Sequence, residues 1–243
     1  MKIITNISEL KTELNLLKEK GASIGFVPTM GALHQGHLSL AQKCIATDDV
    51  CIVSIYVNPT QFNDSMDLQK YPRDLDRDCE MLRNENCNFV FAPSDSEMYP
   101  EPDQRVFNFG EMGKVMEGKH RPGHFNGVAQ IVTRLFEIVE PDRAYFGQKD
   151  FQQLAIIRKL VSDMDYTTEI VACPIIREPD GLAMSSRNML LSEQERKSAP
   201  LIYQILQRIR KQFAGKSVSA LVDLVKQEIE KSTILQLEYF QIV

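Results

Sequence analysis

The chain alternates between short apolar runs and stretches in which apolar residues recur at helical spacing. The run VCIVSIYV at 50–57 is almost wholly apolar, whereas Leu10, Leu14 and Leu17 are separated by charged and polar residues. A near-continuous apolar run is typical of a strand covered on both faces, and the second spacing is typical of an amphipathic helix. The pattern therefore predicts strands and helices in alternation.

The predicted order of elements indicates an α/β protein. We expect helices at 7–19, 38–45, 75–83, 128–139 and 151–163, and strands at 23–27, 50–57, 88–92, 144–146 and 169–173. Strands separated by helices imply right-handed crossovers and a Rossmann-like, doubly wound parallel sheet. Ligands of such sheets bind at the carboxyl ends of the strands. The loops after Val27, Val57, Phe146 and Cys173 should therefore carry the chemistry.

The character of the sequence changes after Cys173. The elements expected there are a turn at 179–181, a helix that begins with a capping box of Ser192 and Glu195 and runs toward Phe213, a helix at 219–231, and a strand-like run at 235–243. We therefore expect a Rossmann-like domain at 1–175 that binds the substrates, and a small α+β lid domain at 176–243.

Composition and charge narrow the class of protein. The 243 residues are 43% hydrophobic and 25% charged, with a formal net charge of -5 and no basic stripe, so nucleic acid is a poor candidate partner. The amino-terminal segment lacks the apolar core of a secretory signal, and no uninterrupted apolar stretch of about 18 residues occurs, so we expect a cytoplasmic protein that does not enter a membrane. Five scattered cysteines without a C-x-x-C pair are expected to be reduced, mostly buried thiols.

The segment VPTMGALHQGH at 27–37 places a glycine-bearing loop and two histidines between the first long strand and its helix. A helix start offers unpaired N–H groups and a positive dipole end, which suit phosphates. His34 and His37 are three residues apart, so in helical geometry both can face one phosphate chain. The segment is thus a candidate nucleotide site, although an isolated H-x-x-H is more often a surface or capping pair.

Other nucleotide motifs and a zinc site are the alternatives. The chain has neither a G-x-x-x-x-G-K-[ST] nor a G-x-G-x-x-G motif. His120 and His124 could join the first two histidines around zinc, but Pro122 and Gly123 between them disfavour the helical spacing that two ligands would need. We assign no metal ligand; Asp76 and Asp78 could assist Mg²⁺ or equally lie on a solvated helix face.

Polar side chains follow three other predicted strands. Asn58 and Gln61 come after the second long strand, where amide groups can bind a hydroxy acid, and Lys149 and Gln153 follow the strand at 144–146. The loop MSSRN at 184–188 adds two hydroxyls and a guanidinium, which suit a triphosphate. Each segment alone is weak evidence, but all are predicted to lie at one edge of the sheet.

Six segments, taken in order over about 170 residues, resemble successive signatures of the pantoate–β-alanine ligase family: PTMGALHQGH, VNPTQF, YPRDLDRD, RPGHFNGV, FGQKDFQQL and REPDGLAMSSRN. The H-x-G-H element and the serine loop also resemble the ATP motifs of class I aminoacyl-tRNA synthetases and related nucleotidyltransferases. The resemblance implies ATP-dependent joining of (R)-pantoate to β-alanine through a pantoyl-adenylate, with release of AMP and pyrophosphate. It also implies Mg²⁺ and a homodimer.

The resemblance assigns roles to particular residues. The implied ATP site consists of Met30, Gly31, Ala32, Leu33, His34, Gln35, Gly36, His37, Gly147, Gln148, Lys149, Asp150, Ile176, Met184, Ser185, Ser186 and Arg187. The implied catalytic groups are His37, in the role of proton donor, with His34, Lys149 and Arg187. Pantoate would be bound by Gln61 and Gln153, and β-alanine by Arg121 and His124 with Asn58 nearby.

Family members generally continue for some tens of residues beyond the last residue here. We therefore expect either a C-terminal domain shorter than usual or a truncated chain, and in both cases closure of this lid over ATP would be affected. Two other functions stay open at this point. One is a nucleotidyltransferase that leaves the nucleotide on its product, and the other is a nucleotide-binding module without catalysis.

Overall fold

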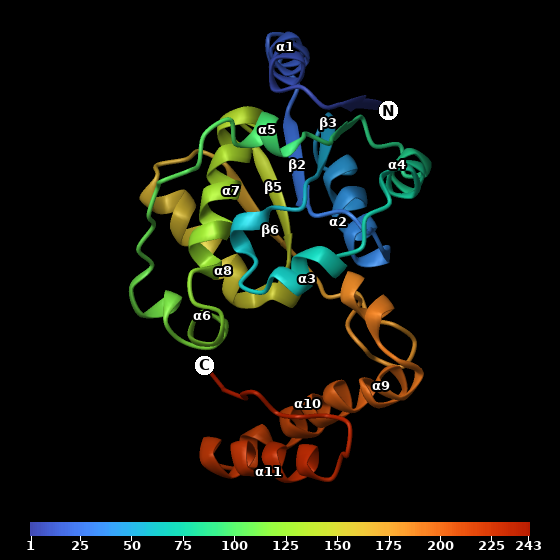
Figure 1. Ribbon diagram of the computed structural model, residues 1–243, viewed down its shortest axis with the longest axis vertical. Coiled ribbons are helices and arrows are strands. Elements are labelled where there is room, and N and C mark those ends of the chain that lie inside the picture. The colour runs from blue at the N-terminus through green and yellow to red at the C-terminus, as the bar shows by residue number, and fades with distance from the viewer. The chain divides into compact units, whose positions relative to one another are not determined.

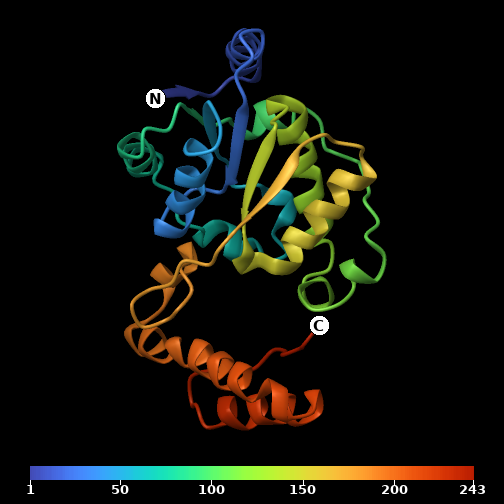
Figure 2. The same ribbon diagram turned by 180° about the vertical axis from the view of Figure 1, so that it is seen from behind.

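A computed structural model describes all residues from 1 to 243. The chain divides into two compact units, Met1–Ile175 and Ile176–Val243. The first unit is a parallel sheet with helices on both sides, as Figures 1 and 2 show from opposite directions. The predicted α/β class is therefore confirmed.

The sheet has six strands in the order β1-β4-β3-β2-β5-β6, and all neighbouring pairs are parallel. Its strands are β1 (Lys2–Ile4), β2 (Ile24–Thr29), β3 (Val50–Ile55), β4 (Phe89–Phe91), β5 (Arg143–Gly147) and β6 (Glu169–Cys173). The chain adds β3 and β4 on one side of β2 and then crosses to add β5 and β6 on the other side. The strand order thus reverses between β2 and β5, which is where doubly wound folds bind ligands.

The helices of the first unit include all five that the sequence predicts. They are α1 (Ile7–Lys18), α2 (Gln35–Ile45), α3 (Ser65–Lys70), α4 (Leu75–Asn84), α5 (Asp95–Met98), α6 (Glu117–His120), α7 (His124–Val139) and α8 (Phe151–Asp163). Two of them begin earlier than predicted, because the first turns of α2 and α7 consist mostly of polar residues and glycine, which give no apolar periodicity. The sequence does not predict the short elements β1, α3, α5 and α6, because segments of three to six residues are too short to show a periodic pattern of apolar residues.

Successive residues of the central strands point into two separate cores. Phe26 and Ile52 lie in a cluster with residues of α1, α7 and α8. Their neighbours Val27 and Val53 lie in a second cluster with residues of α2 and α4. Because side chains alternate across a strand, both faces of the sheet are covered, which explains the near-continuous apolar runs.

The second unit is helical, with η4 (Ser186–Leu190), α9 (Glu193–Ser198), α10 (Pro200–Gln212), η5 (Phe213–Gly215) and α11 (Val218–Glu230). The predicted capping box of Ser192 and Glu195 is present at the start of α9. The single helix predicted from there toward Phe213 is in fact two helices, because Pro200 begins the separate helix α10. The strand predicted at 235–243 is wrong, because that segment has no β partner. Its apolar side chains instead pack against the cluster formed by α10 and α11.

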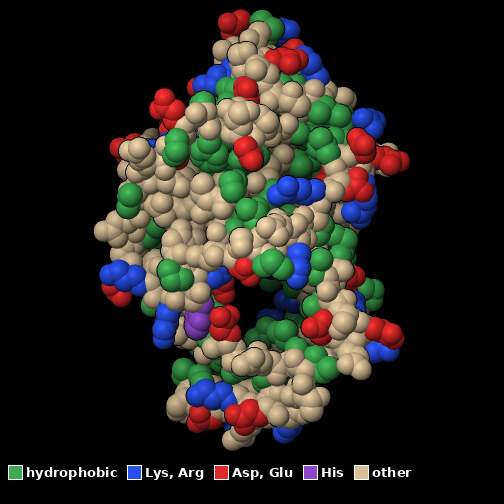
Figure 3. Space-filling view, in the orientation of Figure 1, with side chains coloured by type: hydrophobic (Ala, Val, Ile, Leu, Met, Phe, Trp, Pro, Cys, Tyr) green, Lys and Arg blue, Asp and Glu red, His purple; other side chains and the backbone are tan.

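The surface and the cysteines agree with the composition. All five cysteines are free and buried, as predicted. Acidic and basic side chains are interspersed on the face drawn in Figure 3. None of the helices combines the length and the apolar character needed to span a bilayer.

Candidate active site

The point where β2 and β5 lie side by side brings two predicted loops together. The loop after β2 carries the two histidines, and the loop after β5 carries Lys149 in η3 (Gln148–Asp150). Lys149 lies close enough for its charge to lower the pKa of both His34 and His37. Residues more than a hundred positions apart in sequence are thereby placed at one edge of the sheet.

His34 and His37 form a pair at the start of α2. His34 is the N-cap residue, and its Nδ1 accepts a hydrogen bond from the backbone N–H of Gly36 at 3.1 Å. The ring centroids of the two histidines lie 4.1 Å apart. The capping bond fixes the His34 ring, so one face of the helix start presents both imidazoles, as predicted from their spacing.

Burial decides the charge state of His37. Burial, followed by the nearby His34 and Lys149, lowers its pKa from 6.5 to about 3. Its Nδ1 is enclosed and has no hydrogen-bond partner. Burial and Lys149 also lower the pKa of His34. In the unliganded protein His37 is therefore a neutral imidazole, which can donate a hydrogen bond but carries no positive charge at neutral pH.

The turn before the histidines has an unusual backbone. Gly31 and Ala32 both have positive φ, at 77° and 49°. The Gly31 N–H donates to Thr29 Oγ1 at 3.2 Å, and Thr29 Oγ1 donates to the Ser54 carbonyl at 2.7 Å. A left-handed conformation at a residue other than glycine costs about 1 kcal/mol or more, so surrounding contacts must hold Ala32 in place.

Gln61 reaches the same loop from the end of β3. It is the last residue of η1 (Pro59–Gln61), and its Nε2 lies 3.2 Å from Met30 Sδ. Gln153 lies half-buried in the first turn of α8, which begins directly after η3. Two amide side chains therefore lie on helical turns that follow β3 and β5.

Asn58 and His124 both contact Gln61, and their polar atoms are hydrogen-bonded within the protein. The Asn58 side chain is 1% exposed; it donates to the Gly127 carbonyl at 3.2 Å and accepts from Tyr99 Oη at 3.0 Å. His124 Nδ1 lies 2.9 Å from the Gln61 carbonyl, which can only accept, so Nδ1 carries the proton. Both side chains thus fix the position of η1 against α7.

Arg121 ends the short α6 just before α7. Its Nη1 lies 3.5 Å from His124 Nε2 and 3.9 Å from Glu117 Oε2. Because the proton of His124 is on Nδ1, its Nε2 is the acceptor in the contact with Arg121. Arg121 is half-buried, so part of its guanidinium stays available for an anion.

The predicted residues of the second unit lie in one loop of their own. The Met184 N–H donates to the Ile176 carbonyl at 3.0 Å, and Ser185 Oγ accepts from the Arg187 N–H at 3.3 Å. Ser186 is buried, whereas Arg187 is exposed. Hydrogen bonds within the second unit thus hold this loop in its conformation.

Two buried polar residues near the site have contacts that the sequence does not indicate. Gln152 is not singled out by the sequence, and Asp78 does not lie on the solvated helix face considered for it, because its side chain is buried. Gln152 accepts from the Glu117 N–H at 3.0 Å and donates to the carbonyls of Met112 and Val115, each at 2.8 Å. Asp78 is fully buried and accepts from the Leu33 N–H at 2.7 Å. Neither partnership has a local sequence signal, because the paired residues lie 35 to 45 positions apart.

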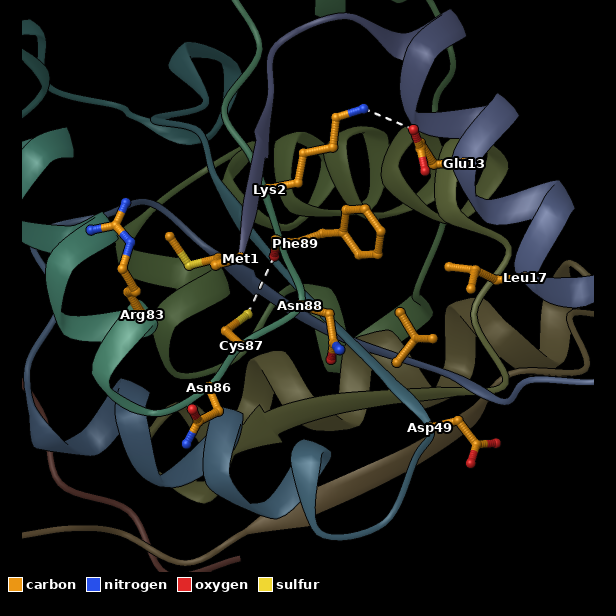
Figure 4. A pocket seen from close by; sticks show the side chains of 11 residues that line it. Met1, Lys2, Glu13, Leu17, Asp49, Arg83, Asn86, Cys87, Asn88 and Phe89 are labelled. Atoms are coloured by element: carbon orange, nitrogen blue, oxygen red, sulfur yellow. Dashed lines mark hydrogen bonds and ion pairs between the residues drawn. The ribbon is translucent and has the colours of Figure 1, made fainter.

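Two pockets of the first unit lie at opposite ends of the strands. A wide depression of about 810 Å³ lies where β1, β3 and β4 begin, and Lys2, Val50 and Phe89 line it (Figure 4). A second pocket of about 360 Å³ lies at the carboxyl ends of β2, β3 and β4 and is lined by Met30, Gly31 and other residues. We place the chemistry at the carboxyl ends despite the larger volume elsewhere, because parallel sheets bind ligands there.

Comparisons with known proteins identify the family of this chain. The sequence model of the family described as pantoate-beta-alanine ligase matches residues 2–243. A pantothenate synthetase of Bacteroides thetaiotaomicron is 55% identical over 243 residues, which are 100% of this chain and 86% of the relative. The family match covers nearly the whole chain. This chain therefore belongs to the pantoate-beta-alanine ligase family.

Other members of the pantoate-beta-alanine ligase family extend the comparison. A pantothenate synthetase of Porphyromonas gingivalis is 51% identical over 243 residues, which are 100% of this chain and 86% of the relative. The crystal structure of pantothenate synthetase from Thermus thermophilus is similar with a TM-score of 0.92 at 41% identity, covering 98% of this chain and 86% of that one. The pantoate-beta-alanine ligase of Francisella tularensis, complexed with beta-gamma ATP and beta-alanine, has a TM-score of 0.85 at 40% identity, covering 94% and 86% of the two chains.

Proposed function

We propose that this protein uses ATP to condense (R)-pantoate with β-alanine, giving pantothenate, AMP and pyrophosphate. The observation that carries the proposal is the family match over residues 2–243. The resemblance of the six sequence segments supports the same reaction. Chemically, the reaction divides into formation of a pantoyl-adenylate and its capture by an amine.

In the first step the carboxylate of pantoate attacks the α-phosphorus of ATP, and pyrophosphate leaves. The transition state places negative charge on phosphoryl oxygens and on the leaving group, so fixed donors and cations stabilise it. The neutral His34 and His37 would donate hydrogen bonds there, and Lys149 would supply positive charge. Gln61 and Gln153 would bind pantoate through their amides, and Arg187 with the rest of the loop at 184–187 stays a predicted contributor to the ATP site.

In the second step the neutral amine of β-alanine attacks the acyl carbon, and AMP leaves. We infer that Arg121 binds the carboxylate of β-alanine, because part of its guanidinium is exposed and both of its protein contacts are long. His124 and Asn58 would contribute by holding η1 and Gln61 in place, since their polar atoms already have protein partners.

Mg²⁺ would accompany ATP. No group of three or more His, Cys, Asp or Glu side chains is arranged to hold a metal ion. We expect the cation to be held mainly by phosphate oxygens and water, because Mg²⁺ loses its hydration shell reluctantly. Its chemical contribution would be to neutralise phosphate charge. A homodimer is a further proposal that follows from the family resemblance, and the cytoplasmic location expected from the sequence stays a proposal.

The test is an assay with ATP, pantoate and β-alanine together and with each acid omitted in turn. We expect release of AMP and pyrophosphate that depends on both acids. An adenylylated end product would instead indicate a nucleotidyltransferase, and ATP binding without turnover would indicate a binding module. Either of these outcomes would overturn the proposal.

The variant His37→Ala tests the assigned chemistry separately from the substrates. We expect the fold to be retained and adenylate formation to slow by about 10²-fold or more, as is typical for loss of one donor to a developing anion. A variant with turnover near that of the wild type would remove His37 from the mechanism.

A further inference from the structure

The turn formed by Gly31, Ala32 and Leu33 directly precedes the N-cap histidine of α2. Two consecutive residues of this turn, Gly31 and Ala32, have left-handed φ values. Glycine adopts that conformation freely, whereas alanine does so only when its surroundings compensate. The conformation at Ala32 therefore requires a partner outside the turn.

The carboxylate of Asp78 is that partner. Asp78 lies in the first turn of α4, and its Oδ1 accepts from the Leu33 N–H at 2.7 Å across 45 positions of sequence. Burial raises the pKa of Asp78, while hydrogen bonds from the backbone N–H groups of Leu33 and Ala32 act to lower it. The two N–H donors of the turn thus converge on one carboxylate.

The second oxygen of this carboxylate is buried against the turn. Asp78 is 0% exposed, and its Oδ2 has no hydrogen-bond partner. A Cβ atom added to Gly31 would lie 3.0 Å from that oxygen, so the turn packs directly against it. A buried carboxylate with one unsatisfied oxygen is a poor way to stabilise a core, and such groups call for a functional explanation.

We propose that Asp78 is a positioning residue for the ATP-binding histidines. By fixing the backbone of the turn at Ala32 and Leu33, it sets the point from which His34 caps α2 and from which both imidazoles face the phosphates. This inference rests on the proposed function of the site, because it assigns ATP to the histidine pair. Asp78 is distant in sequence, and because its side chain is 0% exposed it acts through the turn that it supports.

The variants Asp78→Asn and Asp76→Asn form a matched pair in the first turn of one helix. Asp76 is exposed, so its replacement removes the same charge without touching the turn. We expect Asp78→Asn to weaken ATP binding and to slow pantoate-dependent pyrophosphate release, each by about 10-fold or more, since small displacements of catalytic groups have large effects on rate. The KM for β-alanine should stay within about twofold, because Arg121 does not belong to the turn, and Asp76→Asn should behave as wild type.

A double substitution tests whether the effect passes through the strained residue. In an Ala32→Gly background the left-handed conformation no longer needs support, so the loss caused by Asp78→Asn should shrink. Equal losses in both backgrounds would overturn the proposal. So would an Asp78→Asn protein that binds ATP within about twofold of the wild type. If Asp78→Asn alone does not fold, the same comparison is made between the double variant and Ala32→Gly.

Imidazole NMR signals keep this test independent of turnover. We expect the ring signals of His34 and His37 to shift in Asp78→Asn and to stay in place in Asp76→Asn; unchanged signals in both variants would contradict the proposal. If the wild type shows no pantoate-dependent turnover, the proposed function fails, while the NMR and ATP-binding results still decide the role of Asp78.

Discussion

At the scale of single residues, burial in the protein determines whether His37 is charged at neutral pH. A histidine beside ATP phosphates is usually imagined as a cation, yet burial brings the pKa of His37 to about 3. Under the proposed function, the positive charge near the phosphates would come from Lys149, which is exposed and pairs with Asp150 at 3.2 Å. The resemblance to the family implies a proton donor at His37, and for the unliganded protein a neutral hydrogen-bond donor is the form that the geometry supports.

The charge state of His37 predicts how stability changes with pH. The unfolded chain binds a proton on this histidine below about pH 6.5, whereas the folded chain does so only near the lowered pKa of about 3. The stabilising effect is therefore complete above pH 6.5 and is lost as the pH falls toward 3. The free energy of unfolding should decrease by up to about 1.4 kcal/mol per pH unit in that window from this group alone.

The measurement compares wild type with His37→Gln by urea unfolding between pH 7 and pH 4. We expect a steeper loss of stability with falling pH in the wild type, because glutamine does not titrate. Parallel pH profiles for the two proteins would mean that the pKa of His37 is not lowered by folding.

At the scale of elements, the irregular segments of the site depend on long-range hydrogen bonds rather than on local propensity. Asn58 and Tyr99 fix η1, and Gln152 fixes the segment that leads into α6. Short helical turns have little stability of their own, so these side chains determine where Gln61 and Arg121 lie.

Replacing Gln152 by alanine should loosen one segment without disturbing the histidines. The variant leaves the Glu117 N–H and the carbonyls of Met112 and Val115 without their partner. We expect faster hydrogen exchange in residues 110–121 and a severalfold higher KM for β-alanine, with ATP binding unchanged. The contrasting variant is Gln153→Ala, for which we expect a higher KM for pantoate. A Gln152→Ala protein with normal exchange in 110–121 would show that other contacts suffice.

The sequence predicts the helices and strands better than it predicts the irregular segments and their contacts. Apolar periodicity locates the long helices and all strands but β1, because burial on both faces of a sheet leaves a direct trace in residue type. The motif histidines are predictable from their place after β2. Asp78 is not, since its pattern equally fits a solvated helix face, and only the tertiary fold brings its carboxylate to Leu33. The segment at 235–243 has strand-like residues, but a strand needs a partner, and none adjoins it.

At the scale of the whole molecule, the two units have separate cores. Two clusters cover the faces of the sheet in the first unit, and a third lies between α10 and α11 in the second. The third cluster is the smallest, and the partly buried Leu235, Leu237, Phe240 and Ile242 of the C-terminal segment pack against it. A small core stabilises a unit less, because burial on folding grows with size.

Leu221→Ala should therefore destabilise the second unit selectively. Leu221 is 0% exposed in the small cluster, and removal of a buried leucine side chain typically costs about 2–5 kcal/mol. We expect faster hydrogen exchange in α10 and α11, while peptides from α7 stay protected as in the wild type. Val218 lies on the same helix but is 50% exposed, so Val218→Ala is the matched control and should leave both units protected. Equal loss of protection in α7 and α11 would mean that the chain unfolds as a single cooperative body despite its separate cores.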